Sequence, residues 1–168
     1  ASSTGSYDVR SVIRALADDG DLLELRPRWA ANVVTALTTI GGMPVGVVAN
    51  QPLALAGTLD IPASQKAARF VATCDAFNLP IITLVDTPGF SIGVEAERRR
   101  APGKIMNFMQ ALQLCTVPRI SIILRKSYGQ AYLNMGGGRN SDEVAAWPTA
   151  EVSFMDPTFA VKVVHGLA

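Results

Sequence analysis

Two glycine-containing segments follow apolar runs, and both could place backbone or polar groups where chemistry is feasible. Residues 86–90 (DTPGF) follow the run 81–85, and residues 127–131 (SYGQA) come shortly after the run 120–124. Buried parallel strands build ligand sites at their carboxyl ends. Both segments are therefore candidate sites.

The segment 127–131 predicts a strand that turns directly into a helix at Gly129. The backbone N–H groups of Gln130 and Ala131 would then lack helical partners and point out of the helix N-terminus. Such a pair can hold an anion or a developing oxyanion, and a glycine lets a ligand approach the backbone closely. An ordinary tight turn is the alternative interpretation, because glycine occurs in many turns.

Other candidate residues have equally plain structural interpretations. Tyr128 and Tyr132 could line a pocket or pack in the core. The charged patch 95–100 could bind phosphates of coenzyme A or a nucleotide, but it is also typical of a solvated face with internal ion pairs. Cys74 lies on an apolar helical stripe, so we expect it in the core.

Two further motifs do not fit their usual functions. Residues 86–89 resemble a GTPase switch segment, but the chain lacks the phosphate loop that a GTPase requires. Residues 89–93 match G-x-S-x-G, and Asp156 and His165 follow as an acid and a base. Residues 87–88 separate the predicted strand from the first glycine, which disfavours a hydrolase nucleophile elbow.

Composition narrows the class of protein. The chain has 168 residues, of which 49% are hydrophobic and 17% charged, with a net charge of +1. This composition argues against disorder and against nucleic-acid binding by bulk charge. One histidine and two cysteines exclude a multi-histidine or four-cysteine metal site, so we expect no metal. Without an apolar run long enough to span a membrane or a recognisable signal peptide, we expect a cytoplasmic or organelle-matrix protein.

Hydrophobic periodicity predicts an α/β protein that begins with a helix capped by Asp8. A hairpin and βα units with both sheet faces covered follow, and repeated ββα units can wind as a layered spiral. We expect strands at residues 22–25, 32–40, 44–49, 81–85, 120–124, 144–147 and 152–155, and helices from 61 to about 77, around 105–112 and from 157.

Ten short segments, taken in order, resemble a known family. The chain from residue 7 to about 167 is similar to the C-terminal half of the carboxyltransferase β subunit of biotin-dependent acyl-CoA carboxylases. The matching segments are 7–10, 50–52, 59–61, 66–70, 74–78, 86–90, 117–118, 124–126, 128–129 and 146–150.

The resemblance implies a crotonase-like (ClpP/crotonase) ββα spiral. It also implies transfer of CO2 from N1-carboxybiotin to the α-carbon of an acyl-CoA, with this half binding biotin. By the resemblance, the N–H groups of Gln130 and Ala131 act as oxyanion donors, Gly129 allows approach, and Leu133 contacts the substrate. The biotin-binding residues that it implies are Thr87, Pro88, Gly89, Phe90, Tyr128 and Tyr132.

The same resemblance implies partners and boundaries. The partners are a biotin carboxyl carrier protein, a biotin carboxylase subunit, an N-terminal carboxyltransferase half that binds the acyl-CoA, and further copies in a homo-oligomer. Residues 1–6 are small and polar, so we expect from their composition a flexible leader or a cloning remnant. Residues 7–168 would be the C-terminal carboxyltransferase domain, cut at its C-terminus and inactive alone.

Two other functions remain open. One is a biotin-independent, crotonase-like acyl-CoA hydratase or decarboxylase, which would need an acidic or basic side chain that the sequence does not reveal. The other is a non-catalytic assembly domain, in which the turn at Gly129 would tolerate substitution. Many family members have glycine where this chain has Gln130, so the identity of the acyl-CoA stays open.

Overall fold

The computed structural model describes residues 5–91, 98 and 101–166. Of the charged patch 95–100, only Arg98 is among them, so the predicted role of that patch lies outside the described residues.

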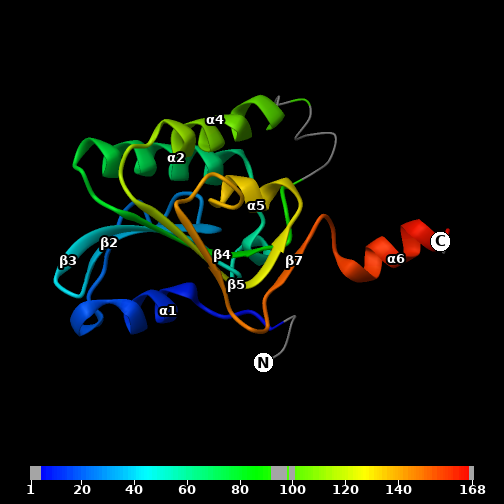
Figure 1. The fold of residues 1–168 in the computed structure, drawn as a ribbon, viewed down its shortest axis with the longest axis horizontal. Coiled ribbons are helices and arrows are strands. Elements are labelled where there is room, and N and C mark those ends of the chain that lie inside the picture. Colours follow the sequence, from blue (N-terminus) through cyan, green and yellow to red (C-terminus); the bar gives the residue numbers. More distant parts are fainter. Residues whose placement is uncertain (1–4, 92–97, 99–100, 167–168) are drawn as a thin grey trace.

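The described residues form one seven-stranded mixed sheet at the centre of the fold (Figure 1). The first three strands are antiparallel, and the third to the sixth run parallel to one another. The seventh pairs with the far end of the fifth, beyond the sixth. The strands are β1 (Leu23–Glu24), β2 (Val33–Ile40), β3 (Met43–Asn50), β4 (Ile81–Thr87), β5 (Arg119–Tyr128), β6 (Glu143–Ala146) and β7 (Glu151–Ser153).

Helices cover both faces of this sheet. The helix α1 (Val9–Leu16) lies on one face, and α2 (Ile61–Ala76), α4 (Ala101–Leu114) and α5 (Gln130–Asn134) lie on the other (Figure 1). The helix α6 (Pro157–His165) extends away from these layers (Figure 1). Two 3₁₀ turns, η1 (Asp18–Gly20) and η2 (Leu55–Gly57), complete the described helices.

Local sequence accounts for the N-caps of α1 and α2 and for the residues of the core. Asp8 accepts a hydrogen bond from the N–H of Arg10, and Asp60 accepts one from the N–H of Ala63, as N-cap residues do. Alternate strand residues enter two separate apolar clusters: Val85 packs towards α2, and Leu84 packs towards α1. This division explains why the central strands are apolar on both faces.

The predicted order of elements is confirmed, but two strands end later than predicted. β4 continues to Thr87 and β5 continues to Tyr128. Thr87 pairs with Ser127, and Lys126–Tyr128 pair with β7. These pairings join residues far apart in sequence, so polar residues that local patterns assign to a loop belong to the sheet.

Candidate functional site

The carboxyl ends of β4 and β5 bring the two glycine-containing segments together. Thr87 and Ser127 are paired at the ends of these parallel strands. Residues 88–90 and 129–131 therefore leave the sheet at the same edge, which is where parallel α/β sheets build ligand sites.

The turn at Gly129 has the geometry that its sequence predicts. Gly129 has φ 63° and ψ −150° and forms the N-cap of α5, a conformation that favours glycine. Its N–H donates to the Ser153 carbonyl at 2.9 Å. Within the described residues, the N–H groups of Gln130 and Ala131 have no hydrogen-bond partner. Ala131 is fully buried, and a buried N–H without a partner is rare.

Three side-chain hydrogen bonds hold α5 against its neighbours. Asn134 Nδ2 donates to the Ile105 carbonyl at 2.9 Å, and Asn140 Nδ2 donates to the Leu133 carbonyl at 2.9 Å. Ser121 Oγ donates to the carbonyl of Met135 at 3.0 Å. Since these bonds anchor both the body and the end of the helix, its first N–H groups are held in fixed positions.

The side chains of the two tyrosines that flank the turn pack against the protein interior. Tyr128 is buried, and its hydroxyl donates to the carboxylate of Glu151. Burial, followed by this hydrogen bond, raises the pKa of Tyr128 above its usual value. Tyr132 is half-buried against the core, and a side chain at Gly137 would collide with its ring. Leu133, on the same helix, is 37% exposed.

The loop after β4 is fixed by its own hydrogen bonds and by the chain beside it. Thr87 is buried, and its hydroxyl and the backbone of Gly89 are within 3.2 Å of each other. The Gly89 carbonyl accepts from the N–H of Leu59 at 3.0 Å, and Phe90 forms a parallel bridge with Leu59. Pro88 is exposed. The loop is therefore held in place where it leaves the sheet beside the end of β5, from which the turn at Gly129 starts.

A buried carboxylate beneath the site was not predicted from the sequence. The side chain of Asp86 is 2% exposed and accepts from Tyr7 Oη at 2.8 Å and from Arg125 Nε at 3.0 Å. It also accepts from the N–H of Lys126 at 3.3 Å, while its own N–H donates to Asn50 Oδ1 at 3.1 Å. Burial is the main cause, and the negative charge of Asp86 the next, of a raised pKa of the Tyr7 hydroxyl. These contacts lock the ends of β3, β4 and β5 together.

The sequence held a signal for this carboxylate. Asp86 ends one apolar strand, and Arg125 directly follows the apolar run of the next. Parallel neighbours place such residues side by side, so the pair could have been proposed from the pattern alone.

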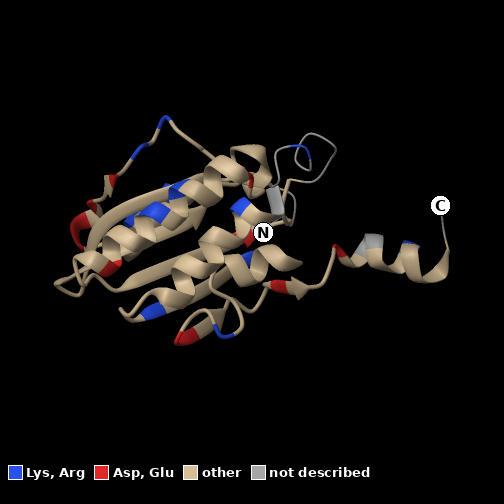
Figure 2. Cartoon of the chain, turned by 90° about the horizontal axis from the view of Figure 1, so that it is seen from above, with Lys and Arg blue, Asp and Glu red and all other residues tan. Residues whose placement is uncertain are grey.

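Metal ligands and membrane helices were also sought in the described part of the chain. No group of three or more His, Cys, Asp or Glu side chains there is arranged to hold a metal ion. None of the helices within residues 5–91 and 101–166 is long and apolar enough to cross a membrane. Lys and Arg residues are interspersed with Asp and Glu in the view of Figure 2.

Comparisons with known proteins agree with this architecture. The profile of the carboxyl transferase domain matches residues 1–166. The propionyl-CoA carboxylase beta chain of Roseobacter denitrificans is 44% identical over 160 residues, which are 95% of this chain and 31% of that protein. The biotin-dependent acetyl-/propionyl-coenzyme A carboxylase beta5 subunit of Mycobacterium tuberculosis is 47% identical over 160 residues, 95% of this chain and 29% of that protein.

A solved structure shows the same fold. The crystal structure of a hexameric transcarboxylase 12S core with methylmalonyl-coenzyme A superposes with a TM-score of 0.93 at 44% identity, covering 98% of this chain and 32% of that one. The fold is the crotonase-like α/β fold, as the sequence predicted. The chain spans about a third of the length of these relatives. Because the carboxyl transferase domain profile matches residues 1–166, the chain belongs to the carboxyl transferase domain family.

Proposed function

We propose that this chain is the carboxybiotin-binding part of an acyl-CoA carboxyltransferase. The observation that carries the proposal is the pair of backbone N–H groups at Gln130 and Ala131, which have no partner among the described residues. They stand at the carboxyl end of a parallel strand, beside an ordered loop. The family to which the chain belongs supplies the reaction class.

The two N–H groups would donate to the ureido oxygen of biotin. Carboxybiotin supplies activated CO2 when it is bound. Fixed N–H donors at this position would stabilise negative charge on the ureido oxygen without reorganising. Gly129 leaves room at this point because its left-handed backbone carries no side chain. The site thus needs no side chain that titrates near neutral pH.

The remaining residues would shape the pocket. Residues 87–90 would form the wall opposite the turn, and the hydrogen bonds between Thr87 and Gly89 would keep that wall in place. Tyr128 and Tyr132 pack in or against the core next to the turn, and the exposed side chain of Leu133 would face the acyl group. In this arrangement, Leu133 would help to select the length of the acyl chain.

The rest of the reaction would come from partners. An N-terminal carboxyltransferase half would bind the acyl-CoA, and a biotin carboxyl carrier protein charged by a biotin carboxylase would deliver the CO2. The relative of known structure forms a hexamer, and we propose that this chain also acts within a homo-oligomer. A cytoplasmic or organelle-matrix location and a domain over residues 7–168 remain predictions.

A chimera tests the proposed function. This chain would replace the matching third of the transcarboxylase 12S subunit, to which it is 44% identical. Decarboxylation of methylmalonyl-CoA would then be measured with and without free biotin. We expect biotin-dependent turnover. The Gln130→Pro variant should reduce it by about 10²–10³-fold, because it removes one oxyanion donor.

Gln130 suits this test because proline is tolerated at the first position of a helix. The Gln130→Ala variant keeps the N–H and separates its effect from that of the side chain. Turnover that ignores biotin would favour the hydratase or decarboxylase alternative. No turnover in a chimera that still assembles as a hexamer would favour the assembly domain.

A further inference from the structure

A small cavity next to α2 is lined by several positively charged residues. Its volume is about 60 Å³, and it lies between α2 and the loop that joins β1 to β2. Three of its lining side chains are cationic: Arg26 from the loop, and Lys66 and Arg69 from α2. Among the described residues, no carboxylate lines it.

An aromatic ring holds the two arginines in position. The guanidinium groups of Arg26 and Arg69 lie 5.7 and 5.9 Å from the centroid of the Trp29 ring. Cation–π contacts of this kind orient a guanidinium without neutralising it. Neither guanidinium has an ion pair or hydrogen bond within the described residues. Their donors therefore remain available to a ligand.

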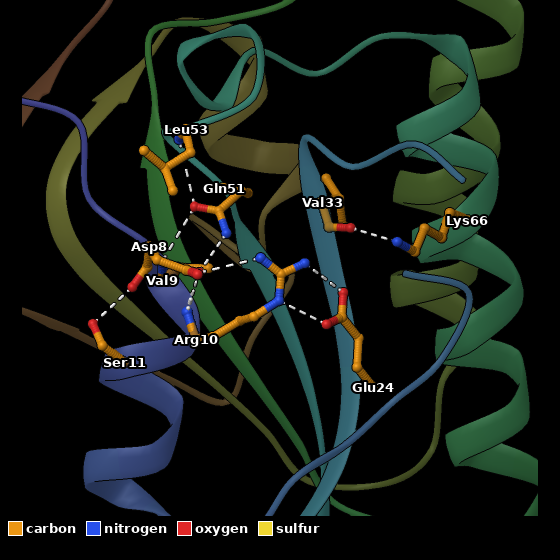
Figure 3. A network of polar contacts seen from close by, with 9 residues as sticks. All are labelled: Asp8, Val9, Arg10, Ser11, Glu24, Val33, Gln51, Leu53 and Lys66. Atoms are coloured by element: carbon orange, nitrogen blue, oxygen red, sulfur yellow. Dashed lines mark hydrogen bonds and ion pairs between the residues drawn. The ribbon is translucent and has the colours of Figure 1, made fainter. Parts of the chain in front are cut away.

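The third cation is an almost fully buried lysine. Lys66 is 2% exposed, and its Nζ donates to the Val33 carbonyl at 2.7 Å (Figure 3). The same Nζ lies 3.4 Å from the Ala30 carbonyl, to which it also donates. An ammonium group has three donors, so one is left for a further partner. Burial lowers the pKa of Lys66, as expected for an ammonium group without a paired charge.

The acidic residue beside Lys66 does not neutralise it. Glu24 acts on Lys66 electrostatically, but both its carboxylate oxygens bind Arg10, at 2.7 Å to Nε and 2.9 Å to Nη2 (Figure 3). Asp8 binds the same guanidinium at 3.2 Å. The acids of this network are thus committed to Arg10, and the cavity keeps an excess of positive charge.

The loop beside the cavity is also held in a costly conformation. Arg26 and Ala30 have φ values of 54° and 48°, in the left-handed region that residues other than glycine rarely adopt. Such residues persist where the surroundings enforce them, and they cluster at ligand sites.

We propose that this cavity binds a phosphate group. Two guanidinium groups and one ammonium group are the donors that recognise phosphate oxygens in proteins. A cavity of this volume accommodates a group of a few heavy atoms but not a whole nucleotide. The ligand is therefore either free phosphate or the terminal phosphate of a larger molecule whose remainder lies outside.

Calorimetric titration with inorganic phosphate tests this proposal on the whole chain. The titration is run at constant ionic strength set with chloride, so that general screening does not change. We expect saturable binding that Arg69→Gln and Arg26→Gln each weaken by about ten- to a hundredfold, as loss of one charge-assisted hydrogen bond predicts. Circular dichroism confirms that each variant is folded.

Arg14→Gln is the matched control, since Arg14 is exposed on α1, on the other face of the sheet. It removes the same charge and should leave the phosphate affinity unchanged. An equal loss in this control, or no saturable binding by the unmodified chain, would overturn the proposal.

Coenzyme A and dephospho-coenzyme A distinguish the two sources of phosphate. The cavity takes the phosphate of a larger ligand if coenzyme A binds more tightly than phosphate and Arg69→Gln weakens the binding of coenzyme A but not of dephospho-coenzyme A. If inorganic phosphate alone binds, it takes the free ion. Both results are independent of biotin and of turnover, so they stand apart from the proposed carboxyltransferase function.

Discussion

The carboxylate of Asp86 connects the strands that carry the candidate site. It binds Tyr7, Arg125 and the backbone of Lys126 from a nearly fully buried position. We expect Asp86→Ala to lower the free energy of unfolding by about 3 kcal/mol, because it leaves the Arg125 guanidinium without its buried partner. This is the lower end for a broken buried pair, since the Arg125 side chain is 18% exposed. Urea denaturation measures the change.

Glu143→Ala provides the control for Asp86→Ala. Glu143 is exposed on β6, and its removal should change the stability by less than about 0.5 kcal/mol. Equal stability of the Asp86→Ala variant and the unmodified chain would contradict the role assigned to this carboxylate.

Single residues were predictable from the sequence only where their signal was local. The unpartnered N–H groups followed from one glycine placed between an apolar strand and a helix. The partners of Asp86 did not, because Tyr7 lies 79 residues away along the chain. Packing of Tyr128 against Glu151 was equally out of reach, since it depends on how β7 pairs with β5.

Close contact between α2 and β3 depends on a glycine. A side chain at Gly46 would collide with Cys74 Sγ and would lie 3.2 Å from the ring of Phe70. We expect Gly46→Ala to lower the free energy of unfolding by about 1–3 kcal/mol through overpacking. Thermal and urea denaturation measure this loss.

A second substitution checks that the loss comes from this contact. Cys74→Ala, combined with Gly46→Ala, removes the colliding sulfur and should recover part of the stability. Gly103→Ala in α4 is the control: no atom of the described residues lies within 4 Å of its added carbon. Alanine in a helix should stabilise by about 0.5–1 kcal/mol relative to glycine. A loss at Gly103 as large as that at Gly46 would refute the packing explanation.

The junction between α2 and β5 should respond to pH through Asp75. Its Oδ1 accepts from the N–H of Thr116 at 2.7 Å, the hydroxyl of Thr116 at 2.9 Å and the N–H of Val117 at 3.2 Å. The Thr116 hydrogen bonds hold the pKa of Asp75 below its usual value. A depressed pKa stabilises the fold above the unfolded value of about 3.9, and that contribution disappears as the pH falls through the folded pKa.

We therefore expect Asp75→Asn to be less stable than the unmodified chain at pH 7, with the difference narrowing below about pH 4. Urea denaturation across this range measures it. Asp21→Asn should show no such trend, since Asp21 is exposed and its carboxylate has no hydrogen bond within the described residues. A constant difference for Asp75→Asn from pH 7 to pH 3 would contradict the prediction.

Elements were predictable where hydrophobic periodicity was strong. The hairpin of β2 and β3, the cap of α2 at Asp60 and the buried stretch of β4 all followed from short patterns. The ends of β4 and β5 did not, because the pairings of Thr87 with Ser127 and of β5 with β7 are tertiary. The candidate site lies at these ends, so local sequence patterns could not predict the pairings that surround it.

At the scale of the whole molecule, apolar side chains remain exposed at or just after the ends of β6 and β7 and on α6. Trp147, Phe154 and Val164 are 51%, 84% and 78% exposed, and α6 extends away from the layered body (Figure 1). Exposed large apolar side chains mark interaction sites where they form one patch. We expect the chain to self-associate, and Phe154→Ser with Val164→Ser should shift sedimentation velocity profiles towards the monomer.

Phe77→Ser is the control for self-association. Phe77 is 74% exposed but lies at the end of α2, away from that surface. If the chain sediments as a monomer at all concentrations, or if Phe77→Ser dissociates it equally, the apolar surface of β7 and α6 is not an association surface.

The central claim, that the turn at Gly129 receives biotin, is tested most directly by an NMR titration of the isotope-labelled chain with biotin. We predict that the amide signals of Gln130 and Ala131 shift most, because their N–H groups lack partners among the described residues. The amide signals of Thr87, Gly89 and Phe90 should shift with them, since these residues leave the sheet at the same edge. In the Gln130→Pro variant, the remaining shifts should be smaller at every biotin concentration. Saturable shifts confined to other surfaces, or unchanged amides at Gln130 and Ala131, would contradict the account.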